Sequence, residues 1–356
     1  MIIDADAHID ETDATWEHID PGAASFKPRT LALAEGSSIA PGDTRPHRMW
    51  QINGELRVRR WRDDVRTGTT RELRELADVP GRLAHMDRLG VDVQVLYPTL
   101  FLQAFTSQPE VELAICRAYN RWLAEATAPS KGRLRWVAAI PCLSMTEAVQ
   151  ELRFAADHGA CGVFKVSIDS ISRPASDPYF FPLYEEAERL NVPICFHVAN
   201  GDPVRHDLNR PLVTTVGLIN LETISSFTHL VLSGTPARFP RLRFGWIEVA
   251  SSWIPYLIHD LEAKKKRMGS LFFDLTTDLL RSYRFYATCD TLDDIPYLLK
   301  FGAEDNLMLG TDYGHSDQSA EMDAHSVLRK RAKNGEIPGD VVTKILGENA
   351  KRFYGI

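Results

Sequence analysis

Short apolar runs rich in β-branched and aromatic residues recur along most of the chain. Runs of this kind are typical of buried strands, and they cover residues 2–6, 91–96, 134–140, 162–166, 193–197, 242–248, 284–288 and 307–310. Stretches of helical periodicity separate most of them, at 110–128, 146–158, 178–190, 223–232, 252–266 and 295–301. Strands that alternate with helices of about ten to fifteen residues form βαβ units and a parallel sheet. Eight such strands predict the α/β class and a closed (β/α)8 TIM barrel.

The alternative to a barrel is a doubly wound open sheet. The nucleotide-binding sequences common in that fold, GxGxxG and GxxxxGK[ST], follow none of the eight runs. A barrel takes about 250 residues, and more with insertions, so the 356 residues fit one domain spanning 1–356. We therefore expect a single barrel that carries an insertion.

The segment from Thr12 to Asp78 fits neither a helix nor a series of core strands. Within it, Asn53-Gly54 separates two arms at 48–52 and 55–61, which is the strongest short signal for a β-hairpin. A loop this long in a compact domain is usually functional. We interpret residues 12–78 as a lid-like insertion after the first strand. It would cover the pocket or reach a neighbouring subunit, with Trp50 or Trp61 supplying apolar contact.

Composition and charge exclude several kinds of partner. The chain is 44% apolar and 25% charged, and no apolar run approaches the ~20 residues of a membrane helix. Its net charge of -7 argues against nucleic-acid binding, which needs a clustered basic face. The basic run Lys264–Arg267 follows a helical stretch and is expected to be a solvated helix C-terminus. We expect a small-molecule substrate, no nucleic-acid or membrane partner, and a homo-oligomer, most simply a dimer.

Cysteine usage indicates a reducing compartment. The cysteines are dispersed without CxxC spacing and mostly lie in apolar segments, at Cys116, Cys142, Cys161, Cys195 and Cys289. An odd, scattered set of this kind predicts buried reduced thiols and a cytoplasmic protein. No basic stretch precedes an apolar one near Met1, so no signal peptide is expected.

Polar residues stand at the ends of several predicted strands, where an α/β barrel places its active site. Asp6 and His8 end the first strand and, being two residues apart, point to the same side. His197 ends the fifth strand, and Asp312 follows the eighth. Each alone could be a turn acid or a structural histidine. Together, two imidazoles and carboxylates with room for water are the ligands of a catalytic zinc or a similar divalent ion.

Longer motifs follow one another in a fixed order through the chain. They are Ile3-Asp-Ala-Asp-Ala-His8, Arg82-Leu-Ala-His-Met-Asp-Arg-Leu-Gly-Val-Asp-Val-Gln-Val95, Ala118-Tyr-Asn-Arg-Trp-Leu123, Asp177-Pro-Tyr-Phe-Phe-Pro-Leu-Tyr184, Val192-Pro-Ile-Cys-Phe-His197, Leu232-Ser-Gly-Thr-Pro-Ala-Arg-Phe-Pro-Arg-Leu242, Gly310-Thr-Asp-Tyr-Gly-His315 and Asn349-Ala-Lys-Arg-Phe-Tyr354. In this order they resemble the amidohydrolase-related family of the amidohydrolase superfamily. The resemblance is to the branch that includes aminocarboxymuconate-semialdehyde decarboxylase, resorcylate-type decarboxylases and several hydrolases. It covers nearly the whole chain apart from the early insertion.

This resemblance implies a (β/α)8 barrel with a single divalent metal ion. Zinc is the expected metal, with manganese, iron or magnesium as alternatives. Carried onto matching positions, the ligands are Asp6, His8, His197 and Asp312. Asp6 stands where many relatives have histidine or glutamate. Glu11 is close enough to be a substitute ligand or an acid beside the ligands.

The sixth strand departs from the decarboxylases of the branch. In the decarboxylases that this region resembles, the matching position is a histidine, in a His-Gly-Gly type turn, that serves as acid or base. Here Glu248 takes its place. Burial can raise the pKa of a carboxyl group enough for it to shuttle a proton, so Glu248 and Asp312 are the candidate catalytic residues. Glu248 could instead only hydrogen-bond the substrate or a neighbour. His229 lies in a helical stretch away from the strand ends and is expected to be structural.

Four further residues are candidates for substrate contact. Lys165 in the fourth strand is similar to the bridging carboxylated lysine of two-metal relatives. Because the branch is generally mononuclear, a contact to a substrate carboxylate or an ordinary ion pair is expected instead. The other candidates are His206 in the loop after the fifth strand, His315 and Trp50.

Three functions are compatible with these residues. The first is a metal-dependent hydrolase of a small carboxylated or aromatic substrate, in which Asp312 takes the proton of metal-activated water. The alternative is a non-oxidative decarboxylase, a carbon-carbon lyase that acts on an aromatic or related carboxylic acid at the same metal site. In that reaction Asp312 or Glu248 would protonate the ring carbon. The third, a barrel without activity, is disfavoured by the complete ligand set.

Overall fold

Eight parallel strands form a closed barrel in the computed structural model, which describes residues 1–32, 48–59, 67–166, 173–199, 219–269, 278–315 and 320–356. Neighbouring strands follow in sequence order, as β1 (Ile3–His8), β5 (Val93–Tyr97), β6 (Leu134–Ala139), β7 (Ala160–Val166), β8 (Ile194–His197), β9 (Phe244–Ile247), β10 (Phe285–Cys289) and β11 (Leu307–Leu309). The barrel closes where Ala7 pairs in parallel with Tyr313 and the His8 amide donates to the Tyr313 carbonyl at 2.6 Å. The predicted TIM barrel is confirmed, and the open doubly wound sheet is excluded.

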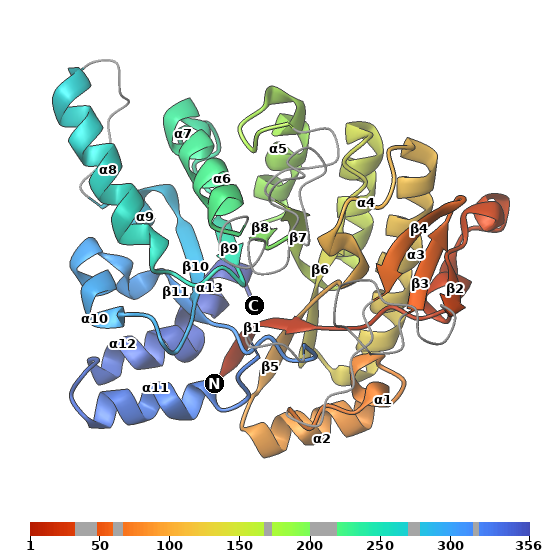
Figure 1. Cartoon of the computed structure of the whole chain (residues 1–356), viewed down its shortest axis with the longest axis horizontal. Helices are drawn as coiled ribbons and strands as arrows, with labels where there is room; N and C mark the ends of the chain where they lie inside the picture. The colour runs from red at the N-terminus through yellow and green to blue at the C-terminus, as the bar shows by residue number, and fades with distance from the viewer. Residues whose placement is uncertain (33–47, 60–66, 167–172, 200–218, 270–277, 316–319) are drawn as a thin grey trace.

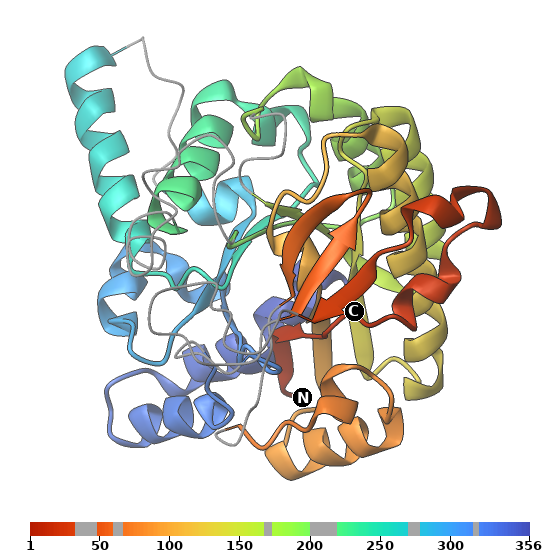
Figure 2. The same ribbon diagram turned by 45° about the vertical axis from the view of Figure 1, so that its right-hand side comes forward.

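Helices surround this barrel on the outside (Figures 1 and 2). They are α2 (Val79–Leu89), α3 (Pro109–Thr127), α4 (Met145–Asp157), α5 (Phe181–Arg189), α6 (Ile219–Ser233), α7 (Thr235–Arg238), α8 (Trp253–Met268), α9 (Leu279–Tyr283), α10 (Ile295–Leu298), α11 (Ala324–Lys333), α12 (Gly339–Thr343) and α13 (Asn349–Tyr354). Helix α8 ends with Lys265, Lys266 and Arg267 in its last turn, as predicted for the basic run. Among the described residues no helix is both long and apolar enough to cross a membrane. All five cysteines are free, and four of them are buried.

A bulge in β1 decides which of its acidic side chains enters the barrel. The pairing between β1 and β5 shifts register between Asp4 and Ala7, so that His8 pairs with Tyr97. A bulge of this kind changes the side to which the following side chains point. Asp4 therefore bonds outward to Gln94 and Thr311, at 3.2 and 2.6 Å, while the side chains of Asp6 and His8 turn inward.

Glycine at position 310 makes room for the inward Asp6 side chain. A Cβ atom added to Gly310 would lie 2.8 Å from the Asp6 Cβ and 3.3 Å from the Thr288 Cγ2. Contacts this short would push β1 and β11 apart. The predicted strand-end motif Gly310–His315 thus begins with a residue that the packing requires.

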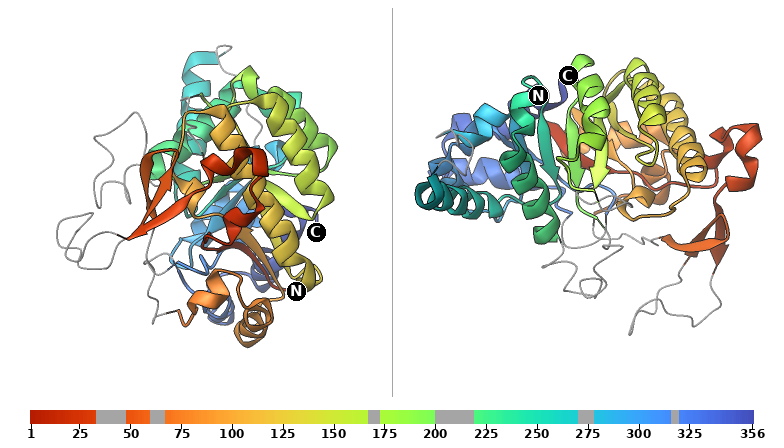
Figure 3. Two further views of the ribbon diagram at one scale, coloured as in Figure 1. Left: turned by 90° about the vertical axis from the view of Figure 1, so that its right-hand side faces the viewer. Right: turned by 90° about the horizontal axis from the view of Figure 1, so that it is seen from above.

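The segment between β1 and β5 carries a small antiparallel sheet of β2 (Arg29–Ala32), β3 (Arg48–Ile52) and β4 (Glu55–Arg59). Asn53 and Gly54 form the turn between β3 and β4 with φ angles of 46° and 84°, as a type I′ turn requires. Figure 3 shows this sheet at one side of the barrel rather than within the ring of helices. Trp50 is buried and packs edge-to-face on Trp16, with 5.7 Å between ring centroids. Trp61 lies outside the described residues.

Candidate metal centre

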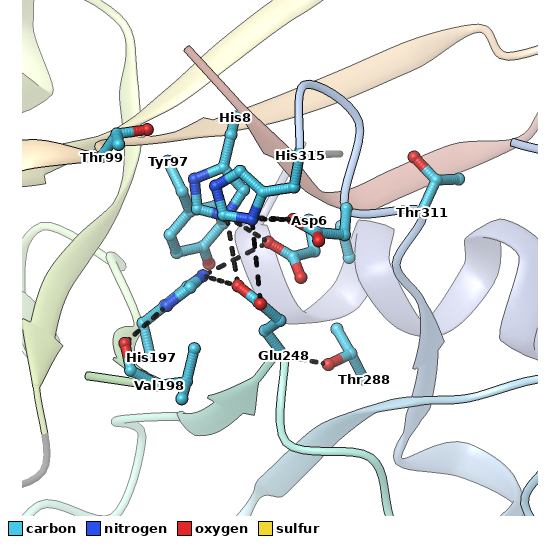
Figure 4. Close-up of polar contacts among 12 residues, drawn as sticks. Asp6, His8, Tyr97, Thr99, His197, Val198, Glu248, Thr288, Thr311 and His315 are labelled. Atoms are coloured by element: carbon cyan, nitrogen blue, oxygen red, sulfur yellow. Dashed lines mark hydrogen bonds and ion pairs between the residues drawn. The ribbon is translucent and has the colours of Figure 1, made fainter. Parts of the chain in front are cut away.

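Four side-chain atoms from three strands of the barrel converge at the end where the C-termini of the strands lie (Figure 4). Asp6 and His8 come from β1, His197 ends β8, and Glu248 follows β9. The Asp6 Oδ1 lies 3.5 Å from Nε2 of both His8 and His197. The Glu248 Oε2 lies 3.4 and 3.3 Å from the same two nitrogens. Spacings of this size are those of ligand atoms that share one central ion.

Asp312 and His315 extend the cluster on the side of β11. The Asp312 Oδ1 lies 3.5 Å from the His8 Nε2, and the His315 Nδ1 lies 2.6 Å from the Asp312 Oδ1. The His315 ring also stacks on the His8 ring, with 3.8 Å between centroids, and its Nδ1 lies 3.8 Å from the Glu248 Oε1. The structure thus brings together all four predicted ligands, the predicted catalytic Glu248 and one predicted substrate contact.

The two strand-end histidines are held so that Nε2 faces the cluster. His8 Nδ1 donates to the Pro98 carbonyl at 3.2 Å, and His197 Nδ1 donates to the Val198 carbonyl at 3.0 Å. A carbonyl oxygen only accepts, so Nδ1 carries the proton in both rings. Nε2 is then the nitrogen left to coordinate a metal ion, which is the arrangement found in histidines that bind metal ions.

The polar atoms that point into the cluster are buried, which is unfavourable in free energy unless a cation balances them. The side chains of Asp6 and Asp312 are 3% and 4% exposed, and that of His8 is fully buried. Among the described residues the Asp6 Oδ1, His8 Nε2, His197 Nε2 and Glu248 Oε2 have no hydrogen-bond partner of good geometry. Buried polar atoms without partners are rare and ask for an explanation such as an ion. The donor set of imidazole and carboxylate fits a divalent metal ion, so this cluster could bind one.

The pKa shifts in the cluster have the same physical origin. Burial lowers the pKa of His8, but the contacts with the Asp6 and Glu248 carboxylates outweigh burial and raise this pKa to about 10. Burial would raise the pKa of Glu248, yet the contacts with His315 and His8 hold it well below the ordinary value. The pKa of Glu248 is therefore lowered in this structure rather than raised by burial. The carboxylates concentrate negative potential that either protons or a metal ion can balance.

Two other predicted residues lie away from this cluster. Glu11 accepts the backbone amides of Thr99 and Leu100 at 2.9 and 3.0 Å, so both of its oxygens serve the loop after β5. Lys165 extends over the Phe180 ring, with its Nζ 4.1 Å from the centroid. The preceding residue, Phe164, faces the barrel interior, where its ring lies 5.9 Å from that of His197. Neighbouring residues of a strand face opposite sides, which explains why Lys165 faces away from the cluster.

Among the described residues, neither of the two remaining candidates for substrate contact is found in the cluster, and His229 lies away from it as expected. Trp50 packs inside the small sheet against Trp16, and the Arg59 guanidinium lies 4.4 Å above its ring. His206 lies outside the described residues. His229 is exposed on α6, in keeping with the expectation that it takes no part in the site.

Sequence reasoning missed the groups that orient the histidines. Tyr97 lies under both rings, with centroids 6.1 Å from that of His8 and 5.0 Å from that of His197. The carbonyls of Pro98 and Val198 fix the tautomers of these two histidines, as described above. Proline after Tyr97 was a visible signal of a strand end, but nothing in the sequence indicated which way its carbonyl points.

Comparisons with known proteins give one consistent result. The Amidohydrolase family model matches residues 3–356. A curated relative, 2-amino-3-carboxymuconate-6-semialdehyde decarboxylase of Dictyostelium discoideum, is 23% identical over 282 residues, which are 77% of this chain and 76% of the relative.

Two solved structures have the same fold over the whole chain. An amidohydrolase from Mycobacterium avium subsp. paratuberculosis K-10 is similar with a TM-score of 0.79 at 19% identity, covering 100% of this chain and 98% of its own. A 5-carboxyvanillate decarboxylase from Sphingomonas paucimobilis is similar with a TM-score of 0.69 at 20% identity, covering 100% and 99%. The resemblance to the branch with carboxymuconate-semialdehyde decarboxylase is confirmed.

Proposed function

The chain belongs to the amidohydrolase family, and from this premise we propose that it is a metal-dependent decarboxylase of a small aromatic or related carboxylic acid. The observation that carries the proposal is the convergence of His8 and His197 with the carboxylates of Asp6, Asp312 and Glu248 at the C-terminal end of the barrel. The decarboxylase relatives favour this reaction over the hydrolase that the sequence put first. Hydrolysis is supported by the family alone.

We assign the metal ligands to Asp6, His8, His197 and Asp312. Glu248, whose Oε2 lies 3.4 and 3.3 Å from the His8 and His197 Nε2, is the further carboxylate that faces the ion. Zinc is the expected ion, and manganese, iron and magnesium are the alternatives. When bound, a divalent ion would act as a Lewis acid toward the oxygen atoms of the substrate and stabilise their negative charge. The carbonyls of Pro98 and Val198 keep both histidines in the tautomer that this requires.

Glu248 is the carboxylate of the cluster that a substrate can best reach. Its side chain is 15% exposed, against 3% and 4% for Asp6 and Asp312. Decarboxylation replaces the carboxylate on carbon with a proton, so a group within reach of that carbon must supply one. Glu248 is ionised in the resting site because its pKa is low, and it must first receive the proton. His315, with Nδ1 3.8 Å from the Glu248 Oε1, is the neighbouring group able to hold it.

The segment 12–78 is assigned to the mouth of this site as a lid-like part of a single domain. It leaves the barrel after β1, at the end where the cluster lies. Asn53 donates to Gln108 at 2.9 Å and Gln103 donates to the Val58 carbonyl at 3.1 Å, which docks the hairpin on the segment after β5. A homo-oligomer and a cytoplasmic location stay predictions from the sequence.

A substrate screen in D2O distinguishes the two reactions. Metal-loaded protein is offered hydroxylated aromatic acids in one panel and amides, lactones and ring-cleavage products in another. We expect CO2 release from the first panel, with one deuterium on the carbon that lost its carboxylate. Turnover confined to amides or lactones, without CO2, would identify a hydrolase.

A further inference from the structure

The turn after β9 has a backbone that its side chains disfavour. Glu248 and Ala250 both have positive φ angles, 57° and 51°, and neither is glycine. L-residues with a Cβ adopt this left-handed region rarely, and the surrounding structure must then hold them there. The conformation of this turn sets where the Glu248 carboxylate points.

Asp293, in the loop after β10, holds this turn from one side. Its Oδ2 accepts the Ser251 amide at 2.9 Å and the Ser251 hydroxyl at 2.6 Å, and its Oδ1 accepts the Ser252 hydroxyl. It also accepts the Asp290 amide of its own loop at 3.0 Å. Asp293 is only 5% exposed, and among the described residues these four donors bond its carboxylate.

The loop of Asp293 is itself fixed to the C-terminal part of the chain. One guanidinium nitrogen of Arg331, in α11, donates hydrogen bonds to the backbone carbonyls of Thr291 and Asp293, at 2.8 and 3.0 Å. On the other side of the turn, the Glu248 amide donates to the Thr288 hydroxyl of β10 at 2.9 Å. The strained turn is therefore clamped between β10 and a loop that α11 keeps in place.

We propose that Asp293 is a positioning residue, which keeps the Ser251 end of the turn fixed so that the Glu248 carboxylate faces the metal cluster. Asp293 contributes no atom to that cluster and acts only through the turn that it holds. Loss of its four hydrogen bonds lets Glu248 and Ala250 leave the left-handed region. Glu248 Oε2 then moves away from the Nε2 atoms of His8 and His197. This inference rests on the assignment of the cluster as a metal site.

The test measures binding of Co²⁺ to the metal-free full-length protein, by competition with a chelator and by the visible spectrum of the bound ion. The variants are Asp293→Asn, Glu248→Gln and the double variant. Asn keeps the size of Asp293 but has one acceptor oxygen for the four donors. Asp294→Asn is the matched control, because Asp294 caps α10 by accepting the Tyr297 amide and does not contact the turn.

We expect Asp293→Asn and Glu248→Gln each to weaken Co²⁺ binding by roughly 10–100-fold, the usual effect of losing a group that orients a ligand. The double variant should bind about as weakly as Glu248→Gln alone, because both changes act through the same carboxylate that faces the cluster. The spectrum of Asp293→Asn should change in the same direction as that of Glu248→Gln. The control should bind and absorb like the wild type.

Three results would overturn the proposal. They are wild-type Co²⁺ binding by Asp293→Asn, wild-type binding by Glu248→Gln, and losses that multiply in the double variant. If Asp293→Asn fails to fold, Ser251→Ala tests the same contact by removing one donor, and a far-UV spectrum verifies its fold. Wild-type Co²⁺ binding by a folded Ser251→Ala would count equally against the proposal. The readout needs no turnover, so a substrate screen that finds no decarboxylation leaves it intact.

Discussion

The imidazole Nδ1 of His315 lies 2.6 Å from the Asp312 Oδ1, the shortest contact between titratable side chains in the cluster. Asp312 has a positive φ of 51°, so its carboxylate, like that of Glu248, sits on a backbone that must be held. The ring of His315 is stacked on that of His8 and can rotate little. His315 therefore orients one proposed ligand while it packs on another.

Replacing His315 should separate these two contributions. His315→Phe keeps the stacking but removes the contact of Nδ1 with Asp312, whereas His315→Asn keeps a polar nitrogen near the position of Nδ1 and removes the stacking. We expect the Phe variant to lose roughly 10–100-fold in metal affinity and the Asn variant to lose less. Chelator competition measures both. A Phe variant with wild-type affinity would mean that Asp312 needs no partner.

Glu248→Gln tests the proton role, and it is measured with enough metal to saturate the site. The neutral amide keeps the shape of the side chain but cannot accept a proton. We expect turnover to fall by roughly 10²–10⁴, the usual value of general acid or base help. Turnover within a fewfold of the wild type would leave Glu248 a structural role at the end of β9.

The lid assignment predicts a selective effect of removing the hairpin. Replacing Asn53–Arg59 with a short Gly-Ser link deletes the contacts with Gln103 and Gln108 and leaves β1 and the cluster unchanged. Substrate KM or turnover should worsen by tenfold or more, about 1.4 kcal/mol of lost interaction, while metal content stays at the wild-type level. Kinetics identical to the wild type would show that the insertion serves another purpose.

The raised pKa of Glu11 predicts that the stability of the protein depends on pH. Burial raises its pKa from 4.5 to about 7 in the folded protein, against the opposing effect of the Thr99 and Leu100 amides. The folded state then binds the proton more tightly than the unfolded state. The associated stability is fully present below pH 4.5 and is lost as the pH rises to about 7, an effect on the order of 3 kcal/mol.

Urea unfolding between pH 4.5 and 7 of metal-free protein measures this slope. Glu11→Gln cannot titrate, so its free energy of unfolding should fall less over this range than that of the wild type. Glu17→Gln is the control, because the Glu17 side chain is 70% exposed. Parallel slopes for the wild type and Glu11→Gln would contradict the raised pKa.

The barrel and the core of the site could be predicted because both follow from periodicity. Alternation of strands and helices fixed the parallel sheet, and parallel strands end at one face, which brought Asp6, His197 and Asp312 together. It was harder to predict which side chains of each strand point into the barrel. The bulge in β1 has no sequence signal here, although it separates Asp4 from Asp6.

Other parts of the site depend on contacts that sequence spacing does not determine. Lys165 was assigned to the pocket by its strand, but Phe164 occupies the inward position of that strand. The low pKa of Glu248 arises from His8 and His315, which are far away in sequence. The clamp of Asp293 on Ser251 joins loops 42 residues apart, and no local pattern announces it.

The central claim is that His8, His197 and the neighbouring carboxylates hold a divalent ion that the enzyme needs. Elemental analysis of the purified wild type, His197→Ala and His158→Ala tests it directly; His158 is exposed and bonds only its own helix at the Phe154 carbonyl in the described structure. We predict about one divalent ion per chain in the wild type and in His158→Ala, and a loss of most of the metal in His197→Ala. Equal metal content in wild type and His197→Ala would contradict the account.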